Sequence, residues 1–180
     1  MKRISIYLLF TIILTASCKK KRYQSLSGSE LEFVNYSKNQ ALKFIDTSNN
    51  IHSLIQSMYV REYQEQIGLY GRTGNYLELY DVSYYSNTSN SIHLFTTVGW
   101  SSPSVKIGFC EYGCFLVPDS ISHKLDLFSL NGITYKNVNL IKVYKNGVPN
   151  SNDTATIFHN REFGIIQLLF PSGKRIIRTN

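Results

Sequence analysis

The sequence predicts an all-β protein with a single antiparallel domain of about ten strands and at most one short helix. Tyrosine and phenylalanine account for 13 and 10 of the 180 residues, and aromatic and β-branched residues favour half-buried strands. Apolar and polar residues alternate along short segments from about residue 30 onward. Clusters of Ser, Asn and Gly separate these segments, as expected for turns. A curved open sheet, a barrel and a sandwich all fit this pattern.

The first part of the domain contains two short predicted strands, Leu31–Tyr36 and Ala41–Asp46, followed by a polar turn at Thr47–Asn50. The stretch Ile51–Ile67 is ambiguous. Apolar residues in its first half recur at helical spacing, whereas those in its second half only partly alternate. We therefore expect a short helix or an irregular strand, followed by a strand.

The next segments are clearer because each is bounded by turn residues. A turn at Gly71–Asn75 precedes a strand over Tyr76–Tyr85, and the polar Ser86–Ser91 separates this from a strand over Ile92–Trp100.

A meander is predicted from Lys124 to the end of the chain. Asn131-Gly132 and Asn146-Gly147 mark two of its turns, because Asn-Gly is the strongest short signal for a hairpin. The expected strands are 125–129, 133–135, 138–144, 154–159, 163–170 and 174–178.

Two cysteines, Cys110 and Cys114, flank three residues that end in Gly113. This pattern predicts a three-residue hairpin loop between the arms Val105–Phe109 and Phe115–Val117, in which the cysteines face each other at a separation that suits a disulfide. A redox-active pair is the alternative, although redox pairs usually enclose two residues at the start of a helix. Metal binding has little support, because no second Cys or His pair lies nearby.

The N-terminus carries the features of an export signal. Lys2 and Arg3 precede an apolar run, Ile4–Leu14, which is shorter than the roughly 20 residues of a membrane-spanning helix and fits a signal-peptide core. We therefore assign residues 1–17 to a signal peptide.

The end of this signal, Thr15-Ala16-Ser17-Cys18 preceded by Leu14, resembles the lipobox of bacterial lipoproteins. The resemblance implies that Cys18 becomes the lipidated N-terminus, and acyl chains acting together give firm membrane attachment. The alternative is an ordinary secretory signal with cleavage near Ala16. Lys19 is not the aspartate that retains such proteins in the inner membrane, so the resemblance places the chain at the outer membrane, facing the periplasm.

A basic tetrad follows the predicted lipidation site, and it accounts for most of the net charge of +7. Six of the 19 basic residues lie in the signal or in this tetrad, so 13 basic residues remain against 12 acidic ones. We expect no nucleic-acid partner, because the domain itself is nearly neutral. The tetrad is expected either to contact lipid head groups or to be a solvated linker. Its members are Lys19, Lys20, Lys21 and Arg22.

Residues 18–29 therefore form the predicted lipidated tether, and residues 30–180 the β domain. Asn131–Val138, Gly164–Leu168 and Gly173 together are similar to the C-terminal part of small uncharacterised outer-membrane lipoproteins of Gram-negative bacteria. That resemblance implies no particular activity.

Catalytic and metal signatures are weak. The four histidines are scattered without metal-ligand spacing, and neither a nucleophile elbow nor a phosphate-binding loop occurs in the sequence, so we expect no enzyme activity, metal or cofactor. Aromatic residues offer the better candidate site, an aromatic binding surface. Cross-strand packing would use the same residues and is the alternative. The candidates are Tyr76, Tyr80, Tyr84 and Trp100.

The sequence thus predicts a membrane-anchored periplasmic lipoprotein that acts by binding. A carrier of a hydrophobic ligand would contain a continuous apolar cavity. A structural or interaction subunit of an envelope complex would instead have a filled core and an exposed aromatic patch. A small hydrolase is the least supported class.

Overall fold

The structure, a computed structural model of the chain, describes residues 20–69, 71–86, 92–99, 105–110, 112–116, 123–146, 148 and 153–179. These residues form twelve strands and one short 3₁₀ helix, η1, so the predicted all-β fold is confirmed. The elements are β1 Arg22–Gln24, η1 Glu30–Phe33, β2 Leu42–Asp46, β3 Ile51–Gly68, β4 Gly71–Tyr85, β5 His93–Val98, β6 Val105–Phe109, β7 Tyr112–Leu116, β8 Lys124–Leu130, β9 Ile133–Lys145, β10 Thr154–Asn160, β11 Gly164–Leu169 and β12 Arg175–Arg178.

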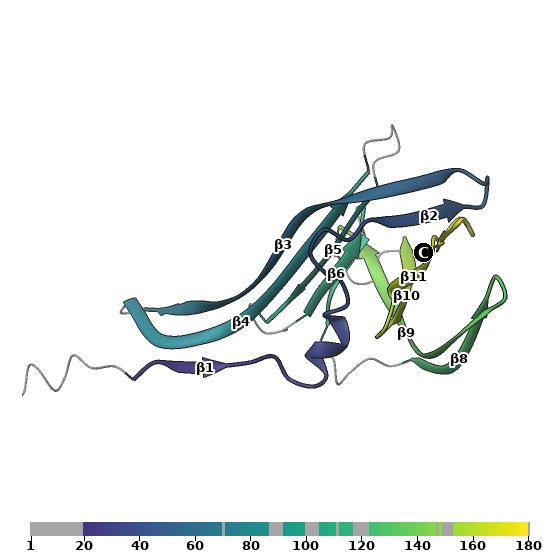
Figure 1. The fold of residues 1–180 in the computed structure, drawn as a ribbon. Helices are drawn as coiled ribbons and strands as arrows, with labels where there is room; N and C mark the ends of the chain where they lie inside the picture. Colours follow the sequence, from purple (N-terminus) through teal and green to yellow (C-terminus); the bar gives the residue numbers. More distant parts are fainter. Residues whose placement is uncertain are drawn as a thin grey trace, which may run out of the picture.

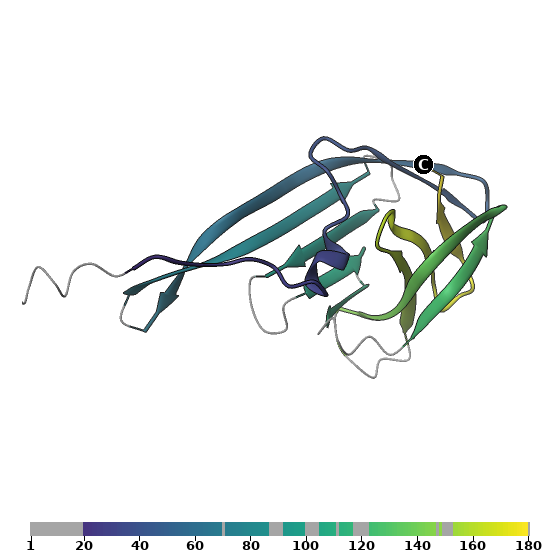
Figure 2. The same ribbon diagram turned by 60° about the horizontal axis from the view of Figure 1, so that its bottom comes forward.

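All twelve described strands belong to one sheet, whose pairings close into a ring (Figures 1 and 2). The order β4-β3-β2-β12-β11-β10-β9-β7-β6-β5 returns to β4 through the β4–β5 pair, which leaves β1 and β8 outside a ring of ten. The pairings are antiparallel except that of β1 with β4, which is parallel. The sheet therefore curves back on itself, and the pairing does not divide it into two stacked sheets.

The main apolar core lies inside this ring, and every strand of the ring contributes at least one buried side chain to it. The segment before β2 adds Leu26, Phe33 and Tyr36. A second, smaller cluster lies on the opposite face of β9–β11 and includes Val138 and Ile166. Because Ile165 belongs to the first cluster and Ile166 to the second, β11 is buried on both faces.

The predicted strand Leu31–Tyr36 is wrong, because η1 occupies its first half. The Ser27 backbone N–H donates to the Glu30 carboxylate at 2.6 Å, and the Glu30 N–H donates to the Ser27 hydroxyl at 3.3 Å. This reciprocal pair has the arrangement of a capping box and forms the turn that leads into η1, whose last residue, Phe33, is buried in the core.

The ambiguous stretch Ile51–Ile67 is one continuous strand, β3, and the short helix considered there does not form. The register shifts between Gln56 and Met58, so two residues of β3 oppose one of β4 and a bulge forms at Ser57. Before the bulge His52 is buried, and after it Tyr59 packs against the main core. The change of parity explains why neither a helix nor a strand period fits the sequence.

β3 and β4 form a hairpin that projects beyond the ring, on the side opposite β8 (Figure 1). β4 begins at Gly71, so the predicted turn Gly71–Asn75 belongs to the strand, and Gly68 and Gly71 are the last paired residues before the hairpin turn. β1, which lies in the segment assigned to the tether, pairs alongside β4 on this projection.

The hairpin that carries the cysteines is tighter than predicted. Phe109 pairs with Tyr112 and Ile107 pairs with Cys114, which leaves Cys110 in a two-residue turn with a φ of 51°. The three-residue loop is therefore wrong, and the two cysteines are not cross-strand partners.

The Cys114 side chain lies outside the described residues. The disulfide therefore stays a prediction, and the observed strand pairing does not support it. Alkylation of the exported, denatured protein tests it: with the bond present, neither thiol reacts until a reductant is added. Because so few residues are enclosed, we expect the bond to contribute about 2 kcal/mol or less.

Candidate functional site

Two members of the predicted aromatic surface, Tyr80 and Tyr84, are wholly buried. The Tyr80 hydroxyl accepts a hydrogen bond from the Tyr36 N–H at 3.0 Å and donates one to the Tyr36 carbonyl at 3.2 Å. Gln56 donates to the Tyr84 hydroxyl at 3.1 Å, and burial raises the pKa of Tyr84 above its usual value. The surface prediction is therefore wrong for these two tyrosines, which take the alternative role in core packing. Trp100 lies outside the described residues.

The third, Tyr76, belongs to a different aromatic group on the projecting hairpin. Tyr23 of β1 stacks on Tyr76 with ring centroids 5.0 Å apart, and the edge of Tyr63 meets Tyr23 at 5.4 Å. The Lys21 ammonium lies 5.6 Å from the centre of the Tyr76 ring. We call Tyr23, Tyr63 and Tyr76 the tyrosine cluster; Tyr23 and Tyr63 are exposed.

The tyrosine cluster fastens β1 to the hairpin, and further contacts extend the attachment along the chain. The Ser25 and Tyr63 hydroxyls are hydrogen-bonded at 2.6 Å, and the Leu26 N–H donates to the Glu78 carboxylate at 3.2 Å. Arg61 holds the other oxygen of Glu78 at 3.1 Å. The segment predicted as a tether is thus bound to the sheet from Arg22 to Leu26.

The predicted membrane-contact residues are placed in part. Lys20, Lys21 and Arg22 are exposed, whereas Cys18 and Lys19 lie outside the described residues. Within the described part of the chain, no helix has the length and apolar character needed to cross a bilayer.

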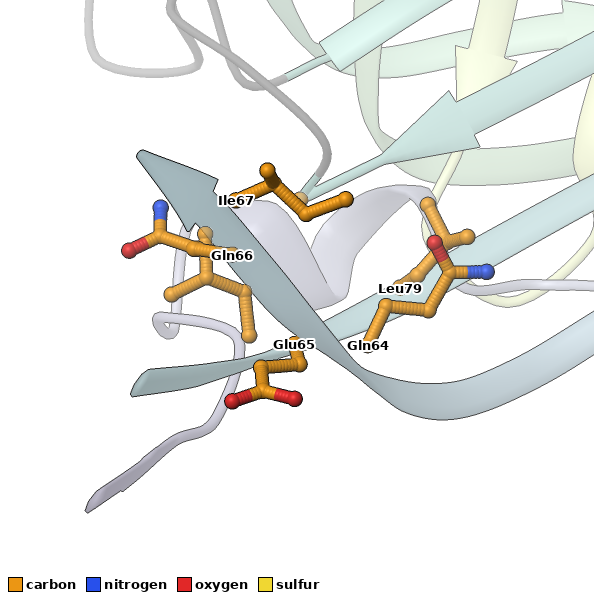
Figure 3. A pocket seen from close by; sticks show the side chains of 7 residues that line it. Gln64, Glu65, Gln66, Ile67 and Leu79 are labelled. Atoms are coloured by element: carbon orange, nitrogen blue, oxygen red, sulfur yellow. The ribbon is translucent and has the colours of Figure 1, made fainter. Parts of the chain in front are cut away.

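A pocket of about 280 Å³ lies beside the end of the hairpin (Figure 3). Glutamine and glutamate side chains from β3 share its lining with leucines from β4, so its wall is part polar and part apolar. The lining residues are Gln64, Glu65, Gln66, Ile67, Leu77, Leu79 and Gly99.

A second pocket, of about 510 Å³, lies where η1 approaches β8–β10 and the turn that follows β10. Three basic and two acidic side chains line it, so its charges largely balance and select no single class of ligand. Its lining comprises Glu32, Lys124, Lys136, Asn137, Asn160, Arg161 and Glu162.

The arrangement closest to a catalytic pair is the buried Asp46–His52 contact, with 3.3 Å between Oδ2 and Nε2. The Asp46 carboxylate also accepts backbone hydrogen bonds from Ser48 and Asn50, both at 2.9 Å. The Asn50 side chain and backbone, which donate to this carboxylate, hold the pKa of Asp46 well below its usual range. Asp46 thus closes the β2–β3 turn, which is a structural role. In the described parts of the chain, no three His, Cys, Asp or Glu residues gather into a group that could hold a metal ion.

A row of apolar side chains is exposed on the outer face of β3 and β4, close to the ring. Ile51 and Ile55 are 65% and 63% exposed, and they alternate with the buried His52 and Leu54. Ile55 pairs directly with Tyr85, which is exposed as well. Ile51, Ile55, Met58 and Tyr85 form what we call the apolar strip.

Sequence reasoning missed the apolar strip and the Tyr23–Tyr76 stack. The Ser57 bulge hides the alternation that would reveal the strip, and no local signal connects β1 to residues about 50 positions later. Comparison with protein-family models, with curated proteins and with solved structures finds no match for this chain.

Proposed function

We propose that the protein is a lipid-anchored, non-catalytic protein of the bacterial cell envelope that binds a protein partner through the apolar strip. One observation carries this proposal: buried side chains from all ten strands of the ring pack into one apolar cluster, while large apolar side chains remain exposed on its outer face. A packed core with large apolar side chains exposed outside it is the arrangement expected of an interaction subunit.

The anchor is supported by the lipobox-like sequence that ends at Cys18 and by the basic residues that follow it. Each Lys or Arg near an anionic leaflet contributes about 1 kcal/mol of attraction, so the tetrad strengthens attachment through the lipid. Lys19 after the cysteine favours the periplasmic face of the outer membrane over the inner membrane, by resemblance to sorted lipoproteins.

A carrier of an enclosed apolar ligand has less support. All ten strands of the ring contribute side chains to one packed cluster. The 280 Å³ and 510 Å³ pockets are open, and both carry polar and charged side chains in their linings. The hydrolase alternative has the Asp46–His52 pair as its best support, and that pair is engaged in a turn.

Replacing Cys18 with serine tests the anchor. We expect the C18S precursor to remain unprocessed and to incorporate no palmitate, because the acylated thiol is gone. Radiolabelled palmitate and detergent-phase partition measure this outcome. Normal processing and unchanged partition of C18S would contradict the lipid anchor.

Photo-cross-linking in cells tests the partner surface. A photoreactive residue in place of Ile55 should give one discrete protein adduct, because interface cores favour desolvated apolar contacts. The same residue in place of Lys142, which is exposed on β9, serves as the matched control. The adduct should disappear when Ile51→Ser is added. An equal yield at both positions would contradict the proposal, and an apolar molecule retained in native mass spectrometry would favour the carrier.

A further inference from the structure

The tip of the projecting hairpin is apolar. Ile67 and Leu69 are 82% and 99% exposed, the highest values among the large hydrophobic residues that the structure describes. Ile67 pairs with Arg72 next to the last pair of the hairpin, Gly68 with Gly71, and Leu69 follows in the turn, so both lie at the end of the hairpin that projects from the ring (Figures 1 and 2). A single exposed apolar residue is ordinary, but two at a projecting turn form an apolar patch that is stabilised by burial away from water.

β1 directs the N-terminal end of the described chain toward this tip. The strand runs parallel to β4 and pairs Arg22 with Asn75, and β4 starts at the tip with Gly71. Following the chain backward from Arg22 therefore leads in the direction of the tip. Cys18 lies four residues before Arg22, and at about 3.6 Å per residue it is at most about 14 Å away. Asn75, the partner of Arg22 on β4, lies four residues after Gly71, which equals the separation between Cys18 and Arg22.

The exit of the chain from the domain is fixed. The tyrosine cluster, the Ser25–Tyr63 hydrogen bond and the Leu26–Glu78 hydrogen bond all hold β1 and the residues after it against β3 and β4. A lipid on Cys18 would consequently be tied close to the hairpin tip, and could not swing freely on a long linker.

The charges beside the tip suit an anionic membrane surface. Lys20, Lys21 and Arg22 are exposed on the chain that approaches it, and Arg72 follows the hairpin turn. Arg72 forms an ion pair with Glu65, with 3.8 Å between Nε and Oε2. Counting Glu65 against these four cations leaves an excess of positive charge, which anionic lipid head groups attract.

We propose that the hairpin tip is a second membrane contact, in which Ile67 and Leu69 enter the head-group region of an anionic bilayer beside the lipid on Cys18. This inference rests on the lipid anchor of the proposed function. Apolar side chains with basic neighbours enter an interface by this combination of burial and charge attraction. Two contacts, the lipid and the tip, would fix the orientation of the domain on the membrane and hold the apolar strip at a constant height above it.

Depth-dependent quenching tests this contact on the full-length, lipid-modified protein. The protein is reconstituted into vesicles of phosphatidylethanolamine and phosphatidylglycerol whose acyl chains carry bromine, which quenches tryptophan fluorescence at close range. Leu69→Trp places the probe at the tip, and its high exposure means that the substitution disturbs no packing. Leu127→Trp, also exposed but on β8 at the opposite side of the molecule, is the matched control. The unsubstituted protein gives the contribution of Trp100.

We expect bromine to quench most of the added emission of L69W and little of that of L127W. Adding Ile67→Ser and Arg72→Glu to L69W should reduce its quenching while the protein still floats with the vesicles. Flotation with equal quenching of L69W and L127W would overturn the tip contact and leave the anchor intact. A protein that fails to float would overturn both the anchor and the tip contact.

Discussion

Replacing Gly164 with alanine should destabilise the protein by about 3 kcal/mol, because the new methyl group meets both backbone strain and overpacking. Gly164 opens β11 with a φ of 73°, and a Cβ there would lie 2.6 Å from the Tyr36 ring. Tyr36 has little freedom to move away. Its hydroxyl accepts the Ile165 N–H at 2.9 Å, and its own N–H donates to Tyr80 at 3.0 Å. Urea unfolding measures the loss as a lower transition midpoint with an unchanged slope.

Gly132→Ala is the matched control, because Gly132 has a φ of 79° and no atom within 4 Å of its added Cβ. Alanine at this position meets only the steric cost of the positive φ, and we expect it to destabilise the protein by about 1 kcal/mol. Equal losses at Gly132 and Gly164 would show that the Tyr36 contact is not responsible for the effect at Gly164.

The parts of the fold that sequence patterns predict well are those where one local signal dominates. Asn131-Gly132 lies at the turn between β8 and β9, and the alternation after Lys124 matches the observed strands closely. β9 is longer than predicted, since it continues through Asn137 at a φ of 53°. Such a backbone conformation ends many strands, but here β8 pairs with β9 on both sides of Asn137, and β10 pairs with it from Val138 onward.

The prediction at η1 failed because one local signal in the sequence outweighed another. The Ser27–Glu30 capping box is visible in the sequence, yet the alternation of Leu31, Phe33 and Tyr36 favours a strand. The bulge at Ser57 has no such signal, because no residue type at that position is typical of a bulge. A one-residue shift moves every following side chain to the other face, so periodicity alone cannot identify β3.

The candidate site is the least predictable part, because long-range pairing creates it. Tyr80 and Tyr76 lie on the same face of β4, but Tyr80 is buried in the core inside the ring, whereas Tyr76 lies on the projecting hairpin. Alternation assigns a face to each tyrosine, and it does not reveal where neighbouring strands stop. Tyr23 becomes part of the site only because β1 pairs with β4.

Acidification should destabilise the protein through His159, which is buried and carries a low pKa. The ring stacks on Phe33 with centroids 4.8 Å apart, and Nε2 lies 2.8 Å from the Asn35 amide oxygen. Nδ1 is buried with no hydrogen-bond partner among the described residues. Burial lowers the pKa of His159 to about 3, because the core cannot solvate the imidazolium ion.

The direction of the pH effect follows from comparing the two states. The unfolded chain binds a proton at His159 below a pKa of about 6.5, whereas the folded protein binds it only near 3. Between these values the unfolded state holds more protons, so stability falls as the pH falls. The loss is at most about 1.4 kcal/mol per pH unit, or about 2 kcal/mol between pH 7 and pH 5.

His159→Gln isolates this effect from other titrations. The glutamine amide can still donate to the Asn35 oxygen, but it takes up no proton in this range. Urea unfolding at pH 5, 6 and 7 should therefore give a shallower pH dependence for H159Q than for the unsubstituted protein, even if H159Q is less stable at pH 7. His93→Gln, which changes an exposed histidine on β5, is the matched control, and H159Q should have the shallower slope of the two variants. If H159Q kept the original slope, another group would have to carry the acid sensitivity, and His159 would be protonated at the same pH in both states. A shallower slope for H159Q than for H93Q would assign the acid sensitivity to the buried neutral imidazole that Asn35 and Phe33 hold.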